Sequence, residues 1–215
     1  MEYIYNIARA SDIIQIFILY FSYYFTFDIE FLIFCIGFYI NFELNNLLKY
    51  NIFLKIFQKN NIPLLGKGTR PIGAKNCCAF KPCDPIYPKY PNSYGMPSGH
   101  SQSTAYFSII LILYLLNNNN INNVVKYFIC SILIFFTIFV MYTRVLFKCH
   151  TIQQTIIGAI IGAIIGIIIA YVLFKNKNKL KNKIKENNNN EDNNYELFLL
   201  IIATIVTILI YKNSI

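Results

Sequence analysis

The sequence predicts an all-α integral membrane protein, a bundle of about five to six transmembrane helices. Of its 215 residues 56% are hydrophobic and only 13% charged, a balance far on the membrane side of globular usage. Because about 20 apolar residues cross the hydrocarbon core, the apolar segments are interpreted as spans. They lie at 11–27, 31–57, 98–116, 124–147, 151–174 and 197–212, and the first and last are short.

The chain divides into three predicted parts. Residues 1–174 form the membrane domain, 175–196 a basic, Asn-rich cytoplasmic linker, and 197–215 a hydrophobic segment that is a possible further span. No cleavable signal peptide is evident in residues 1–10, so we expect the first span to remain as an anchor. All seven prolines fall in the loop 58–97, which opposes regular helix there. A long ordered loop is usually functional, so this loop is expected to form the lid and one wall of a site.

Two spans carry residues at helical spacing. Asn41, Asn45 and Lys49 recur every four residues, which predicts either a polar face toward the bundle interior or an interfacial helix end. In the fifth span small residues form one stripe that lets helix backbones approach closely. The stripe contains Gly158, Gly162 and Gly166, and packing within this chain is favoured over dimerisation.

Three short stretches carry the candidate chemistry. They are Thr69-Arg70-Pro71, the run Tyr94-Gly95-Met96-Pro97-Ser98-Gly99-His100-Ser101-Gln102, and Arg144 followed six residues later by His150. The chain has only two histidines, and both lie in these stretches. Histidine suits proton transfer and nucleophilic attack near neutrality, and arginine matches phosphate oxygens. Two histidines with two arginines therefore indicate phosphoryl transfer without a metal.

The order of the three stretches resembles the signature of the type 2 phosphatidic acid phosphatase superfamily, over roughly residues 41–166. The resemblance implies that His100 is the general acid and that His150 is the nucleophile that becomes phosphorylated. The run 94–102, together with Gln154 four residues after His150, looks most like the dolichyl diphosphatase branch. Many relatives carry aspartate where this chain has Gln154.

One position departs from the family pattern. The lysine usually found seven residues before the arginine is Pro63 here. Either Lys67, three residues before Arg70, or Lys49 is a candidate for the missing cation. Lys67 is expected to matter more, because it shares a loop with Arg70.

The candidate residues have distinct expected roles. Arg70, Arg144 and a lysine would neutralise the phosphate oxygens. Ser98 and Gly99, at the start of an apolar helix, would present backbone amides to the phosphate. Gln154 shares a helical face with His150, so its carbonyl oxygen is expected to accept the imidazole N–H and orient the ring.

No cofactor and no metal site is predicted. Three cysteines, Cys77, Cys78 and Cys83, lie together in the loop, but a structural metal site needs a fourth ligand. A disulfide such as Cys77 to Cys83 is expected if the loop faces an oxidising lumen, and unpaired thiols are the alternative.

The net charge of +9 does not indicate nucleic acid, because six lysines alternate from Lys175 to Lys185 directly after a span. Such a segment marks the cytoplasmic side and attracts anionic lipid. Counting back places His150, His100 and Arg70 on the non-cytoplasmic face. The expected partners are therefore membrane lipids and a lipid phosphate substrate.

The resemblance implies a membrane lipid phosphatase acting on a polyprenyl (dolichyl) diphosphate. Alternatives within the family are a phosphatidate or lysophosphatidate phosphatase and a lipid phosphotransferase. The alternative from another class is a non-catalytic lipid-binding or scaffold protein. Magnesium-independent phosphate release would separate an enzyme from such a scaffold.

Overall fold

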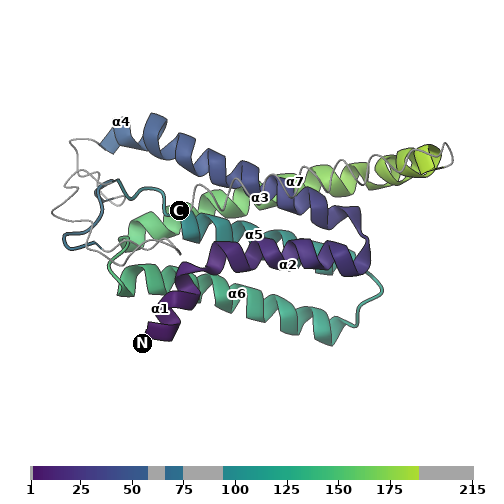
Figure 1. Ribbon diagram of the computed structural model, residues 1–215, viewed down its shortest axis with the longest axis horizontal. Helices are drawn as coiled ribbons and strands as arrows, with labels where there is room; N and C mark the ends of the chain where they lie inside the picture. Colours follow the sequence, from purple (N-terminus) through teal and green to yellow (C-terminus); the bar gives the residue numbers. More distant parts are fainter. Residues whose placement is uncertain (1, 58–65, 75–93, 189–215) are drawn as a thin grey trace.

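The computed structural model describes residues 2–57, 66–74 and 94–188, and within these ranges it is a helical bundle without β-strands (Figure 1). The helices are α1 (Glu2–Arg9), α2 (Ser11–Thr26), α3 (Ile29–Leu47), α4 (Leu54–Phe57), α5 (Gly99–Asn117), α6 (Asn123–Leu146) and α7 (Ile152–Asn188). A π-helical segment, Leu48–Phe53, joins α3 to α4, so this arm is helical from residue 29 to 57. The predicted all-α class is confirmed.

Three of the described helical stretches are long and apolar enough to cross a membrane: Ile29–Ile56, Asn123–Leu146 and Ile152–Asn176. This finding supports an integral membrane protein. The 16 residues of α2 rise only about 24 Å, less than the roughly 30 Å of hydrocarbon. Helix α5 begins with the polar run GHSQST, which lowers its mean hydropathy. The predicted span 197–212 lies outside the described residues.

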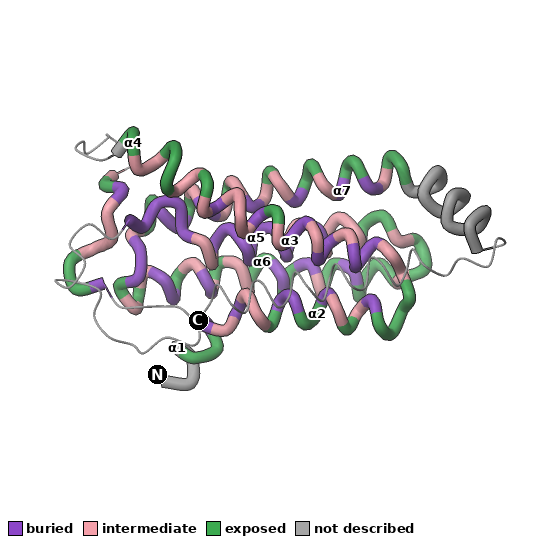
Figure 2. Tube along the Cα trace, turned by 45° about the horizontal axis from the view of Figure 1, so that its top comes forward, coloured by how far each residue is buried: buried purple, intermediate pink, exposed green. Residues whose placement is uncertain are grey.

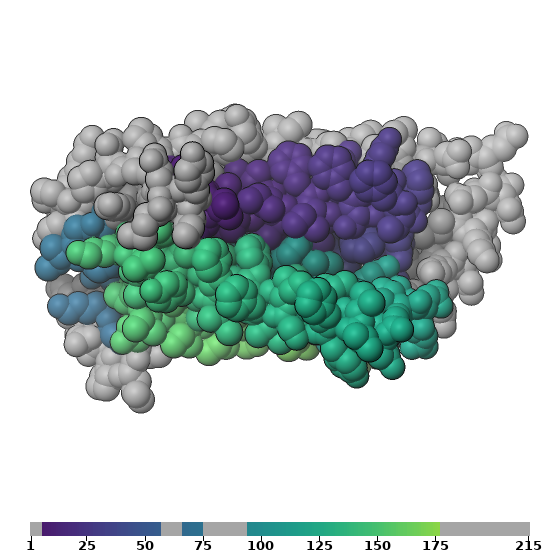
Figure 3. All heavy atoms as spheres, turned by 90° about the horizontal axis from the view of Figure 1, so that it is seen from below, coloured from purple at the N-terminus to yellow at the C-terminus, as the bar shows by residue number. Residues whose placement is uncertain are grey.

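Helix α5 lies at the centre of the bundle and contacts α2, α3, α6 and α7. Its Tyr106 is fully buried beside Phe38, and the Tyr106 hydroxyl donates to the Phe34 carbonyl at 3.0 Å. The outer helices instead expose large apolar side chains, among them Phe135 on α6 and Ile164 on α7, as expected of surfaces that face lipid. Buried positions accordingly concentrate between the helices in Figure 2, and α6 forms much of the outer face seen in Figure 3.

The glycine stripe of α7 packs against the backbone of α5. A Cβ atom at Gly158 would meet the backbone of Ser98, and one at Gly162 would overlap the carbonyl oxygen of Gln102. At Gly166 the nearest backbone atom of α5 would be the Tyr106 carbonyl oxygen, 3.2 Å away. The predicted close packing within the chain is confirmed.

The polar residues of α3 face the bundle interior. Asn45 Nδ2 donates to Gln102 Oε1 at 2.7 Å, and Gln102 Nε2 donates to the backbone carbonyl and Oδ1 of Asn41, both at 3.0 Å. Asn41 and Asn45 are buried. The interior alternative is therefore confirmed for these two residues, and the interfacial one is wrong.

Five chain segments meet at one end of the bundle, on the left in Figure 1. Helices α2, α5 and α7 begin there, whereas α6 and the arm from α3 to α4 end there. The positive dipole ends of three helices therefore lie at this end. The three stretches identified in the sequence all lie here.

Candidate active site

The loop of the first stretch lies against the entry of α5. Thr69 and Tyr94 form an antiparallel bridge, and the Gly95 amide donates to the Gly68 carbonyl at 2.9 Å. The Tyr94 hydroxyl donates to the Phe53 carbonyl at the end of the α3 to α4 arm. A Cβ atom at Gly68 would overlap the Tyr94 side chain, so the close approach depends on glycine.

A tight turn between α6 and α7 explains the spacing of Arg144 and His150. The Arg144 carbonyl accepts from the amides of both Cys149 and His150, at 2.9 and 3.1 Å. The turn folds back over the last residues of α6, so both site residues are buried, Arg144 completely.

The side-chain amide of Gln154 joins His150 to the loop. Its Oε1 lies 3.1 Å from His150 Nδ1, and its Nε2 donates to the carbonyls of Lys67 and Thr69 at 3.0 and 2.8 Å. Because carbonyl oxygens only accept, these two bonds fix which end of the amide is nitrogen. Oε1 is then the acceptor, so Nδ1 of His150 carries the hydrogen and Nε2 keeps its lone pair. The predicted His150 to Gln154 hydrogen bond is present, whereas the bonds to the loop were not predicted.

Cations surround His150. Arg70 Nη1 donates to the Cys149 carbonyl at 3.1 Å, directly beside the histidine. Burial, and after it the charges of Arg70 and Lys49, hold the pKa of His150 well below its usual value. The ring is therefore neutral at neutral pH, as a nucleophile requires.

Lys49, rather than Lys67, acts on the histidines. The Lys49 charge acts on both His150 and His100, whereas the Lys67 side chain is exposed. What Lys67 supplies is its backbone carbonyl, which binds Gln154. The geometry thus favours the lysine that the sequence ranked second, because the helical arm extends through Lys49 to the site.

His100, the second residue of α5, faces the junction of α1 and α2. Its Nε2 lies 3.2 Å from the Arg9 carbonyl oxygen and 3.7 Å from Asp12 Oδ2. Arg144 acts electrostatically on both Asp12 and His100. The sequence analysis missed Arg9 and Asp12. The available signal was an acidic residue at the start of a predicted span, since ionisable residues within membrane segments are costly and usually functional.

Ser98 differs from its expected role. Its backbone amide donates to the Gln154 backbone carbonyl at 3.0 Å, and its buried hydroxyl accepts from Ser101 Oγ at 3.1 Å. The Ser98 amide is therefore engaged within the protein and does not point at a ligand. Gly99, the other residue of the predicted amide cradle, is the first residue of α5.

Cys149, immediately before His150, is disulfide-bonded, to a partner outside the described residues. Cys35 and Cys130 are free. The predicted Cys77 to Cys83 disulfide also falls outside the described residues. No group of three or more His, Cys, Asp or Glu side chains is arranged to hold a metal within residues 2–57, 66–74 and 94–188.

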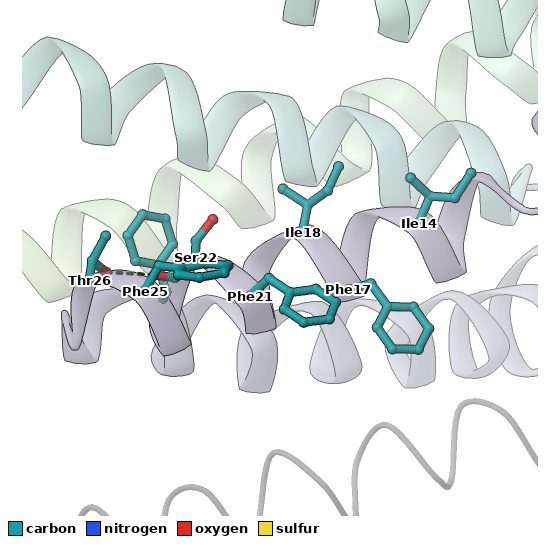
Figure 4. Close-up of a pocket in the computed structure, with 8 residues that line it drawn as sticks. Ile14, Phe17, Ile18, Phe21, Ser22, Phe25 and Thr26 are labelled. Carbon is teal, nitrogen blue, oxygen red and sulfur yellow. Dashed lines mark hydrogen bonds between the residues drawn. The ribbon is translucent and has the colours of Figure 1, made fainter.

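A separate apolar groove of about 570 Å³ runs along the outer face of α2 (Figure 4). Its lining includes Ile14, Phe17, Phe21 and Phe25. None of the three candidate stretches contributes to this lining. The groove is therefore distinct from the histidine cluster, which consists of His100, His150 and the basic residues Lys49, Arg70 and Arg144 that act on them.

The histidine cluster falls inside a matched family region. No curated protein and no solved structure matches the chain. The family model of the PAP2 superfamily matches residues 46–178, more than half of the chain, and this region contains Lys49, all three stretches and Gln154. The chain therefore belongs to the PAP2 superfamily, a family of all-α membrane proteins whose members are phosphatases.

Proposed function

We propose that this protein is a membrane lipid phosphatase that works through a phosphohistidine at His150 without a metal. The observation that supports this most directly is the state of His150. Gln154 holds its Nδ1–H, so Nε2 carries a free lone pair in a cluster with Lys49 and Arg70. A neutral, oriented imidazole among fixed cations suits attack on phosphorus.

The proposed reaction has two steps. Nε2 of His150 attacks phosphorus, the bond from phosphorus to the leaving oxygen breaks, and His100 gives that oxygen a proton. Water then attacks the phosphohistidine and releases inorganic phosphate. Lys49, Arg70 and Arg144 neutralise the phosphate oxygens during both steps.

The favoured substrate is a polyprenyl diphosphate, cleaved to the monophosphate and phosphate. This choice rests on the resemblance of the run 94–102 and Gln154 to the dolichyl diphosphatase branch. A site at the end of a helical bundle suits any lipid phosphate, because the tail can stay in the bilayer while the headgroup enters from water. Phosphatidate or lysophosphatidate hydrolysis, and transfer of phosphate to a lipid hydroxyl, use the same chemistry.

We place the site on the non-cytoplasmic face. The lysines from 175 to 185 follow the membrane part of α7, at the opposite end from His150, which favours a cytoplasmic location for that end. The disulfide at Cys149 supports the same orientation, since disulfides persist in oxidising compartments.

The test is phosphate release by protein purified in detergent, with EDTA present. We expect the highest kcat/KM for dolichyl diphosphate, with phosphatidate and lysophosphatidate as the comparison substrates. His150→Ala should abolish turnover and the acid-labile phosphoprotein trapped from labelled substrate. His100→Ala should reduce turnover severely, because it removes the acid and keeps the nucleophile.

The mechanism, the substrate and the enzymatic activity can each be contradicted by a different result. A strict requirement for added Mg²⁺, or wild-type rates in His150→Ala, would contradict the mechanism. A preference for phosphatidate would change the substrate and leave the mechanism intact. No phosphate release from any lipid would favour the non-catalytic alternative.

A further inference from the structure

The junction of α1 and α2 supplies a charge to the histidine cluster from outside the matched family region, which starts at residue 46. We propose that Asp12 is a positioning residue for His100: its carboxylate stabilises the protonated imidazole and holds the ring ready to protonate the leaving oxygen. This inference rests on the proposed function and extends the site to the N-terminal helices.

The contact is close and largely shielded from water. Asp12 Oδ2 lies 3.7 Å from His100 Nε2, and the two side chains are only 17% and 15% exposed. The other carboxylate oxygen, Oδ1, is buried and accepts no hydrogen bond among the described residues. An acceptor in this situation is costly unless a nearby charge or proton compensates it. The charge of Arg144 acts on this carboxyl, and His100 is in contact with it.

A second contact fixes Asp12 opposite His100. One helical turn further along, Gln15 Nε2 donates to Thr104 Oγ1 at 2.7 Å. Gln15 is three residues after Asp12, and Thr104 is four residues after His100, so the two pairs are consecutive contacts between α2 and α5. Gln15 and Thr104 are completely buried. The register of the two helices thus holds the carboxylate at the ring.

The Arg9 carbonyl determines which ring nitrogen carries hydrogen. A carbonyl can only accept, so His100 Nε2 must be an N–H donor in the 3.2 Å contact. A neutral ring then has an unprotonated Nδ1 and no proton to give from it. His100 can act as an acid through Nδ1 only when both nitrogens are protonated.

Most of the charges around His100 oppose the doubly protonated, cationic ring. Arg144 from α6, Arg70 from the loop and Lys49 from the α3 to α4 arm all act on the ring. Asp12 from α2 is the group of opposite sign in contact with it. A carboxylate beside an imidazole favours the cation, so Asp12 offsets part of this repulsion.

The proton balance is simple. In the loaded state both ring nitrogens of His100 carry a proton, and Asp12 is a carboxylate. As the bond from phosphorus to the leaving oxygen breaks, the Nδ1 proton moves to that oxygen and the ring becomes neutral. Nε2 keeps its hydrogen and donates it to the Arg9 carbonyl throughout. The water that attacks in the second step restores the proton on Nδ1.

The test compares two leaving groups in Asp12→Asn, which keeps the shape of the side chain and removes its charge. A lipid alkoxide needs protonation to leave, whereas the nitrophenolate of p-nitrophenyl phosphate does not. We expect kcat for the lipid to fall on the order of 10- to 100-fold with KM little changed, because the variant weakens a general acid. Hydrolysis of p-nitrophenyl phosphate should stay near the wild-type rate, which also reports correct folding.

Three further variants sharpen the result. Asp12→Glu should recover part of the lipid rate. Combining Asp12→Asn with His100→Ala should lower the rate no further than His100→Ala alone, because Asp12 acts through the ring. Asp28→Asn, which removes a carboxylate just beyond the opposite end of α2, should leave both substrates unaffected.

Equal losses on both substrates, or additive losses in the double variant, would overturn the role of Asp12 and leave the phosphatase assignment standing. If wild-type protein released no phosphate from either substrate, the proposed function itself would fail, and the role of Asp12 with it.

Discussion

The nitrogen of the Gln154 side chain matters as much as its oxygen. The oxygen faces His150, while the nitrogen binds the carbonyls of Lys67 and Thr69. A carboxylate at this position would keep the first contact and set a negative oxygen against two carbonyls. From sequence alone an acid would be expected to serve here, as it does in many relatives; the bonds to the loop argue against it in this chain.

We therefore predict that Gln154→Glu lowers kcat by one to two orders of magnitude, about the loss seen when a residue that orients a catalytic group is disturbed. It should also lower the free energy of unfolding by about 1–3 kcal/mol, because two loop carbonyls lose their donor. Steady-state kinetics and thermal unfolding in detergent measure both effects. The matched control is Gln153→Glu, one residue earlier and exposed, which should behave as wild type. Wild-type activity in Gln154→Glu would mean that the loop does not depend on the amide nitrogen.

The pH dependence of kcat/KM in alanine variants distinguishes the role of Lys49 from that of Lys67. Burial, Arg70 and Lys49 lower the pKa of His150, so the neutral nucleophile persists below the usual histidine value of about 6.5. Removing a positive charge lets that pKa rise. Lys49→Ala should therefore shift the acidic limb of the kcat/KM profile to higher pH, whereas Lys67→Ala should leave the limb in place. An unshifted limb in Lys49→Ala, or a shift in Lys67→Ala alone, would restore the order expected from the sequence.

At the scale of elements, the contact between α5 and α7 sets the distance between the two histidine motifs. Helix α5 carries His100, and α7 begins just after His150 and carries Gln154. Glycines at the contact let the two backbones approach, and the Ser98 amide bonds to the Gln154 carbonyl across it. Small side chains at this contact thus allow the two histidine motifs to come together.

Gly162→Ala tests this dependence. The added methyl group would overlap the Gln102 carbonyl, so the helices must separate at a cost of about 1–3 kcal/mol. We expect a lower melting temperature together with reduced kcat, measured on the same detergent sample. Ile164→Ala, two residues later on the exposed face of α7, is the control and should change neither strongly. A stable, fully active Gly162→Ala protein would show that the contact tolerates separation.

Contacts within one helix could be predicted from the sequence, whereas contacts between segments far apart in the sequence could not. Hydrophobic segments predict helices, and the four-residue spacings of Asn41 with Asn45 and of His150 with Gln154 predict shared faces, because these are local properties of one helix. The sequence ranked Lys67 before Lys49, and the case that the structure adds for Lys49 depends on how far a helical arm continues beyond its apolar part. Asp12 and the engaged Ser98 amide were missed because both contacts join segments more than 50 residues apart, which no periodicity encodes.

At the scale of the whole molecule, the bundle is polarised along its length. Three helices begin at the end that holds the histidines, and the Cys149 disulfide lies at the same end. The two histidines, the positive ends of three helices and the basic residues Lys49, Arg70 and Arg144 thus share one pole, while the apolar faces of α6 and α7 occupy the middle.

The three helix starts have a kinetic consequence. Together with Lys49, Arg70 and Arg144 they attract any small anion, whether or not a lipid is attached to it. Inorganic phosphate released in turnover is such an anion, and it leaves from the place that the next headgroup must enter. Under the proposed mechanism we therefore expect inorganic phosphate to inhibit competitively, and the steady rate in a closed compartment to depend on how fast phosphate is carried away.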